Sequence, residues 1–321
     1  MDQAATRVWR PGWPCPVGAV LAPLRHGRGD PAWQRDDTGR YWLAMRAPSG
    51  PATLAITARP EDGEVRGQAW GPGAEWALET MPDLLGAADD PAGFDPRHPL
   101  LAEAQRRHPD LRIGRSGRLF EALVPAVLEQ KVTGQEANRG YRALVRRHGE
   151  PAPGPAPAEL RLAVLPAAAT VRAVPSWEWL HMQVDPARSR TLVRSARVVD
   201  SLERVVDLPG EVADRRLRLV PGIGVWTSAE IRLRALGDPD AVSFGDYHLA
   251  KDVGWALVGH DIDDDALAEV LEPYRPHRAR VVQLLAATGV RRPRRGPRMA
   301  ARTHLPTARA EDFGSSSGRP T

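Results

Sequence analysis

The stretch Leu219-Val220-Pro221-Gly222-Ile223-Gly224-Val225-Trp226-Thr227 decides the fold of this chain. It predicts a tight turn between two helices, because Gly222 and Gly224 permit positive φ and carry no Cβ. Backbone N–H groups at the start of the second helix then point outward together, and such a helix N-terminus binds anions. The alternative is a plain packing corner between two helices.

The other side chains of this stretch support the turn. Pro221 stiffens it, and Leu219 and Ile223 are expected to pack inward and fix the angle between the helices. Downstream, the segment Ser243-Phe244-Gly245-Asp246-Tyr247-His248-Leu249 places Asp246 twenty-two residues after Gly224. We expect Asp246 at the mouth of a third helix, where an aspartate also serves as an N-cap.

Length and cysteine content limit the class of protein. The 321 residues suffice for two domains with a substantial core. The single cysteine, Cys15, excludes an internal disulfide, a thiolate zinc site and a cysteine-ligated iron–sulfur cluster. Met1 to Pro14 does not resemble a signal peptide, and no apolar run approaches the roughly 18 to 20 residues of a membrane helix. We therefore expect a cytoplasmic protein.

The basic residues are almost all arginine. Of the 44 basic residues only Lys131 and Lys251 are lysine, and the net charge is +4 with a pI of about 9.7. This balance permits nucleic-acid binding without indicating it. Most of the arginines are expected to be solvated surface residues.

Composition and periodicity divide the chain into three parts. Residues 1–96 are expected to form a β-rich domain, with strands over 41–46, 53–59 and 63–70 and a closing helix over 74–85. Residues 97–290 are expected to form a helical domain. The run of arginine and proline over 291–298 opens the last part, 291–321, which is expected to be a disordered basic tail.

Within the helical part, the pattern predicts a series of helices separated by loops. Pro125 is expected to kink or restart the first of them, and the proline-rich segment 151–157 to be irregular. The predicted helices span 119–128, 134–147, 187–202, 211–219, 225–236, 246–257, 266–271 and 276–288.

Taken together, the turn, the long helix after it and Gly245-Asp246-Tyr247 resemble the helix–hairpin–helix DNA glycosylase superfamily. Within it, the chain is most similar to the 3-methyladenine DNA glycosylase II branch. The segment 120–132 matches the early helix pair of that branch, and 273–278 matches its final helix. The implied fold is α+β and mostly α, a helical glycosylase domain preceded by a small antiparallel β-rich domain.

The resemblance assigns roles to the matching positions. Asp246 falls on the catalytic aspartate, and Gly222, Ile223 and Gly224 fall on the phosphate-binding hairpin. Thr227, at the start of the next helix, is assigned to DNA binding in the same way.

The resemblance also assigns DNA binding to Gln130 and Lys131, which precede the helix predicted over 134–147. Lys131 corresponds to the residue that relatives insert into the gap left by a flipped base, and it can instead contact a phosphate. Gln130 precedes it and is assigned to DNA binding.

The resemblance further implies a cation and a mode of reaction. Relatives bind a monovalent cation through hairpin carbonyls, here those of Arg218, Val220 and Gly222, while no other cofactor is required. Trp226 stands where bifunctional relatives carry a Schiff-base lysine, so hydrolysis by water is implied.

Aromatic faces suit an electron-poor or cationic base. Trp226 is the first candidate for the base pocket, and Trp177 and Trp179 are further candidates, with core packing as the alternative for that pair. Glu230, four residues after Trp226, lies on the same helix face and is expected to border the pocket; pairing with Arg234 is the alternative.

Two further titratable residues lie near Asp246 in the sequence. Lys251 is interpreted as a phosphate contact or a surface lysine, with a lyase amine as the alternative. His248 has no metal-ligating neighbour in the sequence and receives no chemical role.

The predicted function is hydrolysis of the N-glycosidic bond of damaged, alkylated purines in double-stranded DNA, leaving an abasic site for base excision repair. The expected protein is monomeric, nucleoid-associated and bacterial, with no membrane partner. Two alternatives stay open: a non-catalytic helix–hairpin–helix DNA-binding protein, and a bifunctional oxidised-purine glycosylase/lyase.

Overall fold

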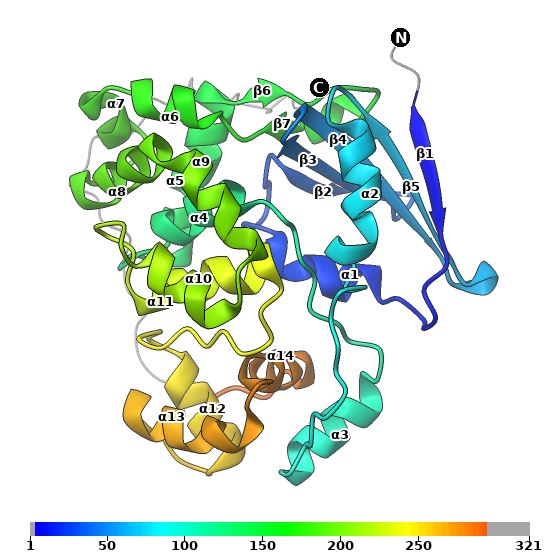
Figure 1. The fold of residues 1–321 in the computed structure, drawn as a ribbon, viewed down its shortest axis with the longest axis vertical. Helices are drawn as coiled ribbons and strands as arrows, with labels where there is room; N and C mark the ends of the chain where they lie inside the picture. The colour runs from blue at the N-terminus through cyan, green and yellow to red at the C-terminus, as the bar shows by residue number, and fades with distance from the viewer. Residues whose placement is uncertain (1–3, 294–321) are drawn as a thin grey trace, which may run out of the picture.

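The computed structural model describes residues 4–293, and its elements fall into three groups (Figure 1). A five-stranded sheet with its helices lies on one side, a layer of helices on the other, and a smaller helical bundle below them in this view. The chain is α+β and mostly helical, as the sequence predicts. Most of the expected basic tail, from residue 294 onward, lies outside the described residues.

The sheet is antiparallel throughout, with strand order β1-β5-β4-β3-β2. Its register pairs Leu43 with Leu54 and Leu54 with Ala69, so apolar side chains gather on one face. The strands are β1 (Ala5–Trp9), β2 (Trp33–Arg35), β3 (Tyr41–Ala47), β4 (Gly50–Arg59) and β5 (Glu64–Trp70). The three predicted strands are confirmed, whereas β1 and β2 were not predicted.

Both faces of the sheet are covered. Helix α2 (Ala74–Leu84) packs on β1, β4 and β5 and buries Met81, while the short helix α1 (Val17–Leu21) adds Leu21 to the same core. The other face holds the stacked rings of Trp42 and Trp70, covered from the helical part of the chain by the ribbon of β6 (Glu150–Pro151) and β7 (Ala163–Val164). The prediction that 151–157 is wholly irregular is wrong at Pro151, because that residue pairs with Ala163.

The helical layer surrounds a core built on α4, in which all ten residues except Glu121 are buried. α4 continues through Pro125, because burial of the residues on both sides holds the helical path, so the expected restart does not occur. The layer consists of α4 (Leu119–Leu128), α5 (Gly134–His148), α6 (Ala168–Ala173), α7 (Ser176–His181), α8 (Pro186–Arg197), α9 (Val199–Glu203), α10 (Gly210–Leu217), α11 (Val225–Ile231) and a π-helical turn (Arg232–Leu236).

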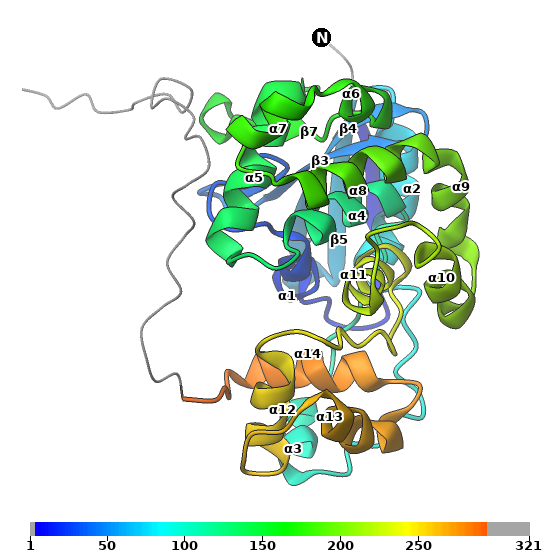
Figure 2. The ribbon, with the colours of Figure 1, turned by 90° about the vertical axis from the view of Figure 1, so that its left-hand side faces the viewer.

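A second helical core lies apart from the first. Leu101, Val253, Leu271 and Val281 pack together in it, so a helix that precedes the layer in sequence joins three helices that follow it. Figures 1 and 2 both show this bundle below the hairpin helices. Its helices are α3 (Pro99–Arg107), α12 (Leu249–Leu257), α13 (Asp264–Leu271) and α14 (Arg278–Thr288).

Several predicted helices have different bounds. The helix expected over 187–202 is divided at Val198, and the one expected from Asp246 begins only at Leu249. The helix expected over 225–236 is α-helical only to Ile231 and continues as the π-helical turn. Among residues 4–293, no helix is both long and apolar enough to span a bilayer.

Candidate active site at the hairpin

The turn between α10 and α11 is built as a hairpin around two buried side chains. Val220 and Ile223 are buried, and the Ile223 N–H donates to the Val220 carbonyl at 3.0 Å. Leu219 was expected to pack inward, and this is wrong: its side chain is 72% exposed. Ile223 was predicted to bind DNA, but it is buried, so its side chain packs in the core and does not reach a ligand.

The two glycines of the hairpin have different reasons to be glycine. Gly222 has φ +103°, and a Cβ added to it would lie 2.0 Å from Thr191 Oγ1 of α8. Gly224 has an extended backbone (φ −94°, ψ −173°), so it does not use the positive φ that was expected. A Cβ on Gly224 would meet nothing within 4 Å. The open space in front of Gly224 is where a ligand can approach the backbone.

The start of α11 carries free backbone donors. Gly224 precedes the helix and supplies no side-chain cap, so the first N–H groups keep their hydrogen-bonding capacity. These groups, together with the helix dipole, favour an anion in front of the hairpin.

Gln130 connects the end of α4 to the hairpin. Its Nε2 donates to the Gly222 carbonyl at 2.9 Å and to Thr227 Oγ1 at 2.8 Å. Thr227 is buried, so its hydroxyl supports the hairpin and is not available to DNA as was expected. Lys131, the next residue, is exposed with φ +54°.

Asp246 lies beside the hairpin helix and has two separate contacts. Its Oδ1 accepts from the N–H groups of His248 and Leu249 at 2.7 and 2.9 Å, and so caps the turn that leads into α12 at Leu249. Its Oδ2 lies 3.4 Å from Trp226 Nε1, a long hydrogen bond from α11. Both side chains are half-buried. The structure therefore brings the predicted acid and the first-choice pocket tryptophan together.

Glu230 is on the same helix as Trp226, but its carboxylate is engaged elsewhere. It pairs with Arg234 and accepts a hydrogen bond from Ser243. Its side chain is 14% exposed. The pairing with Arg234 is thus what the structure shows, and it leaves no free carboxylate of Glu230 for a base.

Trp177 and Trp179 are not brought to the hairpin. Trp179 is buried in the core of the helical layer, so the prediction that its ring faces a base is wrong. Trp177 is 60% exposed against His181 on α7, which lies well away from α11 in Figures 1 and 2. Indole rings at helical spacing look alike in sequence whether they fill a core or line a pocket.

Two of the three carbonyls of the predicted cation site accept hydrogen bonds from the protein itself. The Val220 carbonyl accepts from Ile223, and the Gly222 carbonyl accepts from Gln130. Each of these two carbonyls retains a second lone pair that can accept another contact. Within residues 4–293, no group of three or more His, Cys, Asp or Glu side chains is placed to hold a metal ion.

Comparison with known proteins places this geometry in context. No family model matches the chain. The chain is 30% identical over 243 residues to the probable bifunctional transcriptional activator/DNA repair enzyme AlkA of two Mycobacterium tuberculosis strains. That match covers 67% of this chain and 44% of the relative, so the chain spans less than half the length of these curated proteins.

Solved structures share the fold over almost the whole chain. The 3-methyladenine DNA glycosylase of Archaeoglobus fulgidus has a TM-score of 0.73 at 14% identity, covering 87% of this chain and 96% of that one. The 8-oxoguanine glycosylase/lyase of Clostridium acetobutylicum has a TM-score of 0.67 at 13% identity, covering 89% and 98%. This chain has the helix–hairpin–helix DNA glycosylase fold.

Within this glycosylase fold, one residue near the site was missed by the sequence analysis. Glu129 follows the last residue of α4, and its Oε1 lies 3.6 Å from Nδ1 of His26, in the segment between α1 and β2. Burial would raise the pKa of Glu129, but the hydrogen bond from His26 and the positive charges of Arg234 and His26 outweigh it. The net pKa lies below the ordinary value, although the charge of Asp246 opposes this.

The two lysines of this chain, Lys131 and Lys251, have different surroundings. Lys251 Nζ lies 4.0 Å from the centre of the exposed Tyr247 ring, a cation–π contact. Lys131 is exposed beyond α4. On α11, the residue that contacts Asp246 is Trp226, so this position of the helix carries no lysine amine.

Proposed function

We propose that this protein is a monofunctional DNA glycosylase that removes damaged, alkylated purines from double-stranded DNA by hydrolysis. The observation that carries the proposal is the contact between Asp246 and Trp226 at the hairpin, within a fold shared with DNA glycosylases. The similarity to a DNA repair enzyme over 67% of the chain supports the same reading.

The proposed reaction begins with extrusion of the damaged nucleotide. The hairpin N–H groups hold a phosphate, and the target base leaves the stack at a cost of a few kcal/mol. The Trp226 indole offers a face to the extruded base, and an alkylated purine carrying positive charge is attracted to such a face.

Bond cleavage then depends on charge. As the bond between the base and the sugar breaks, positive charge develops on the sugar, and the Asp246 carboxylate stabilises it and orients a water molecule. Because Oδ1 is held by two backbone N–H groups, Oδ2 is the oxygen available for this role. The base departs with the electron pair of the broken bond. Water then attacks the sugar carbon and passes its proton to the Asp246 carboxylate, and an abasic site remains.

The first prediction concerns Asp246. Asp246→Asn keeps the shape of the side chain but removes the charge, so we expect excision to fall by at least about 100-fold while affinity for the duplex persists. Excision is measured as alkali-labile sites in duplexes that each carry one lesion: 3-methyladenine, 7-methylguanine, hypoxanthine, ethenoadenine or 8-oxoguanine.

Asp263→Asn is the matched control, because Asp263 also caps a helix, accepting from the Ala266 N–H at 3.0 Å. Equal loss of excision in both variants would assign the effect to helix capping instead of charge. A wild-type protein that binds DNA and excises no lesion would favour the non-catalytic alternative.

The bifunctional alternative is supported by the similarity in fold to 8-oxoguanine glycosylase/lyases. It requires an amine that forms an imine with the sugar, and Lys131 and Lys251 are the lysines of the sequence. Borohydride trapping separates the two reactions: we expect no covalent protein–DNA adduct.

We propose two further properties of this enzyme. It acts as a monomer on double-stranded DNA, and the carbonyls of Arg218, Val220 and Gly222 bind a monovalent cation that contacts the same phosphate. A gain in duplex affinity when potassium replaces a bulky organic cation at constant ionic strength supports the cation site.

A further inference from the structure

Helix α8 carries an exposed row of arginines next to the hairpin. Between Pro186 and Arg197 the helix has four arginines and no acidic residue. Arg188 is buried, and the other three form what we call the arginine row: Arg190, Arg194 and Arg197, all exposed. Spacings of four and three residues place them on one face of the helix.

The arginine row lacks the internal partners that many other exposed arginines of this chain have. Arg10, Arg66 and Arg106 each contact a carboxylate. Across residues 4–293, neither an acidic side chain nor a carbonyl or ring is paired with Arg190, Arg194 or Arg197. Like charges on one helix face repel one another. An anionic partner would remove that repulsion.

The arginine row adjoins the surfaces already assigned to DNA. The buried Arg188 donates to the Leu128 carbonyl at 2.8 Å, which fixes α8 against the end of α4, three residues before Lys131. Thr191 lies directly against Gly222 of the hairpin. At 3.6 residues per turn, Arg194 is only about 60° around the helix from Thr191.

We propose that the arginine row is a second DNA-backbone contact, which continues from the hairpin along one strand of the duplex. The proposal rests on DNA being the partner in the proposed function, and not on which lesion is excised. At about 1.5 Å rise per residue, Arg190 to Arg197 spans roughly 10 Å. One strand presents a phosphate per about 3.4 Å of duplex axis, so the row matches two or three phosphates.

The test is the salt dependence of binding to an undamaged duplex. Each phosphate contact adds about 0.9 to the slope of log affinity against log salt. The variant R190Q/R194Q/R197Q should therefore reduce the slope by two to three and weaken binding at low salt. The control with the same change of charge is R10Q/R59Q/R66Q, which removes three exposed arginines at strands β1, β4 and β5 of the sheet, on the other side of the molecule in Figure 1.

The outcomes separate this inference from the proposed function. A slope that changes no more in the α8 variant than in the control overturns the arginine row, even if the wild-type protein excises a lesion. A reduced slope supports it, even if excision is absent. A wild-type protein that does not bind duplex DNA overturns both. Circular dichroism melting of each variant, and of the single substitution R194Q, establishes that folding is unchanged.

Discussion

Asp246 shows how one side chain serves structure and chemistry together. Its Oδ1 caps α12 through two backbone N–H groups, whereas its Oδ2 is directed to the Trp226 indole. The two carboxylate oxygens therefore have different partners, so the contact of Oδ1 with the backbone leaves Oδ2 at the hairpin helix.

Glu129 leads to a prediction about acid stability. Its pKa is depressed in the folded protein, so its ionisation stabilises the fold above the ordinary glutamate pKa of about 4.3, and this contribution disappears as pH falls through the folded value. Glu129→Gln should lower the free energy of unfolding by about 1–3 kcal/mol near neutral pH, and by much less in acid. Denaturant unfolding at both pH values measures this.

Glu61→Gln serves as the comparison for Glu129, because Glu61 is 63% exposed and pairs only with Arg59. Its effect should be within about 0.5 kcal/mol at either pH. If the two variants lose equal stability, or if the Glu129 deficit persists in acid, the contact with His26 does not have the assigned effect.

At the scale of elements, the hairpin predicts different results for its two glycines. Gly222→Ala forces a Cβ against Thr191 at positive φ and should cost about 2–4 kcal/mol, seen as a lower Tm. Gly224→Ala fits its extended backbone and should leave Tm unchanged. The added methyl group of Gly224→Ala occupies the space where we propose that the DNA phosphate binds, so this variant should bind the duplex more weakly. A lower Tm for Gly224→Ala would contradict this division.

Local signals sufficed for the hairpin and for the helices around it. Proline and glycine mark the turn, and apolar periodicity marks α10 and α11. The start of α12 was misplaced, because the Asp246 side chain satisfies the first N–H groups and lets the helix begin three residues later. The division of the predicted helix 187–202 into α8 and α9 at Val198 is not marked by a proline, glycine or capping residue in the sequence.

The contacts that complete the site depend on residues distant in sequence. Gln130 reaches Gly222 across 92 positions, and Glu129 meets His26 of the sheet domain. Periodicity identifies a buried face but not what covers it, which is why Trp179 was assigned to a pocket and Glu129 to none. The resemblance to glycosylases, and not composition, supplied the role of Asp246.

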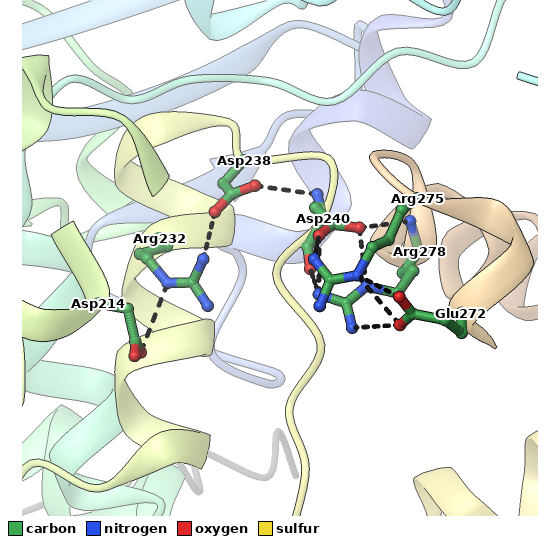
Figure 3. A network of polar contacts seen from close by, with 7 residues as sticks. All are labelled: Asp214, Arg232, Asp238, Asp240, Glu272, Arg275 and Arg278. Carbon is green, nitrogen blue, oxygen red and sulfur yellow. Dashed lines mark hydrogen bonds and ion pairs between the residues drawn. The ribbon is translucent and has the colours of Figure 1, made fainter. Parts of the chain in front are cut away.

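At the scale of the whole molecule, the site lies where two cores meet. The hairpin belongs to the core of the helical layer, whereas α12, which Asp246 caps, belongs to the bundle. Ion pairs connect the helical layer and the bundle at the start of the loop that leads to Asp246, as Figure 3 shows. Arg232 pairs with Asp238 before this loop, and Asp240 binds Arg278 and Arg275 of the bundle.

A second ion pair connects the segment between α2 and α3 to the bundle. Asp89 Oδ1 is 2.6 Å from Arg280 Nη2 of α14, and their side chains are 1% and 5% exposed. Buried charges therefore help to hold the bundle to the rest of the chain, and a change at either connection can move Asp246 relative to the hairpin.

The last prediction tests this positional role at Asp240. Asp240→Asn weakens its contacts with Arg275 and Arg278 but leaves both cores intact, so the loop should lose its fixed position. A misplacement of about 1 Å can cost 100-fold in rate, and we expect excision to fall by roughly 10- to 100-fold while the salt slope of duplex binding stays that of the wild type. Asp261→Asn, which alters an exposed ion pair with Arg292 of the same part of the chain, should change neither quantity. Equal excision by the Asp240 and Asp261 variants would mean that the hairpin and Asp246 keep their geometry without the ion pairs of Asp240, and that other contacts align the two cores.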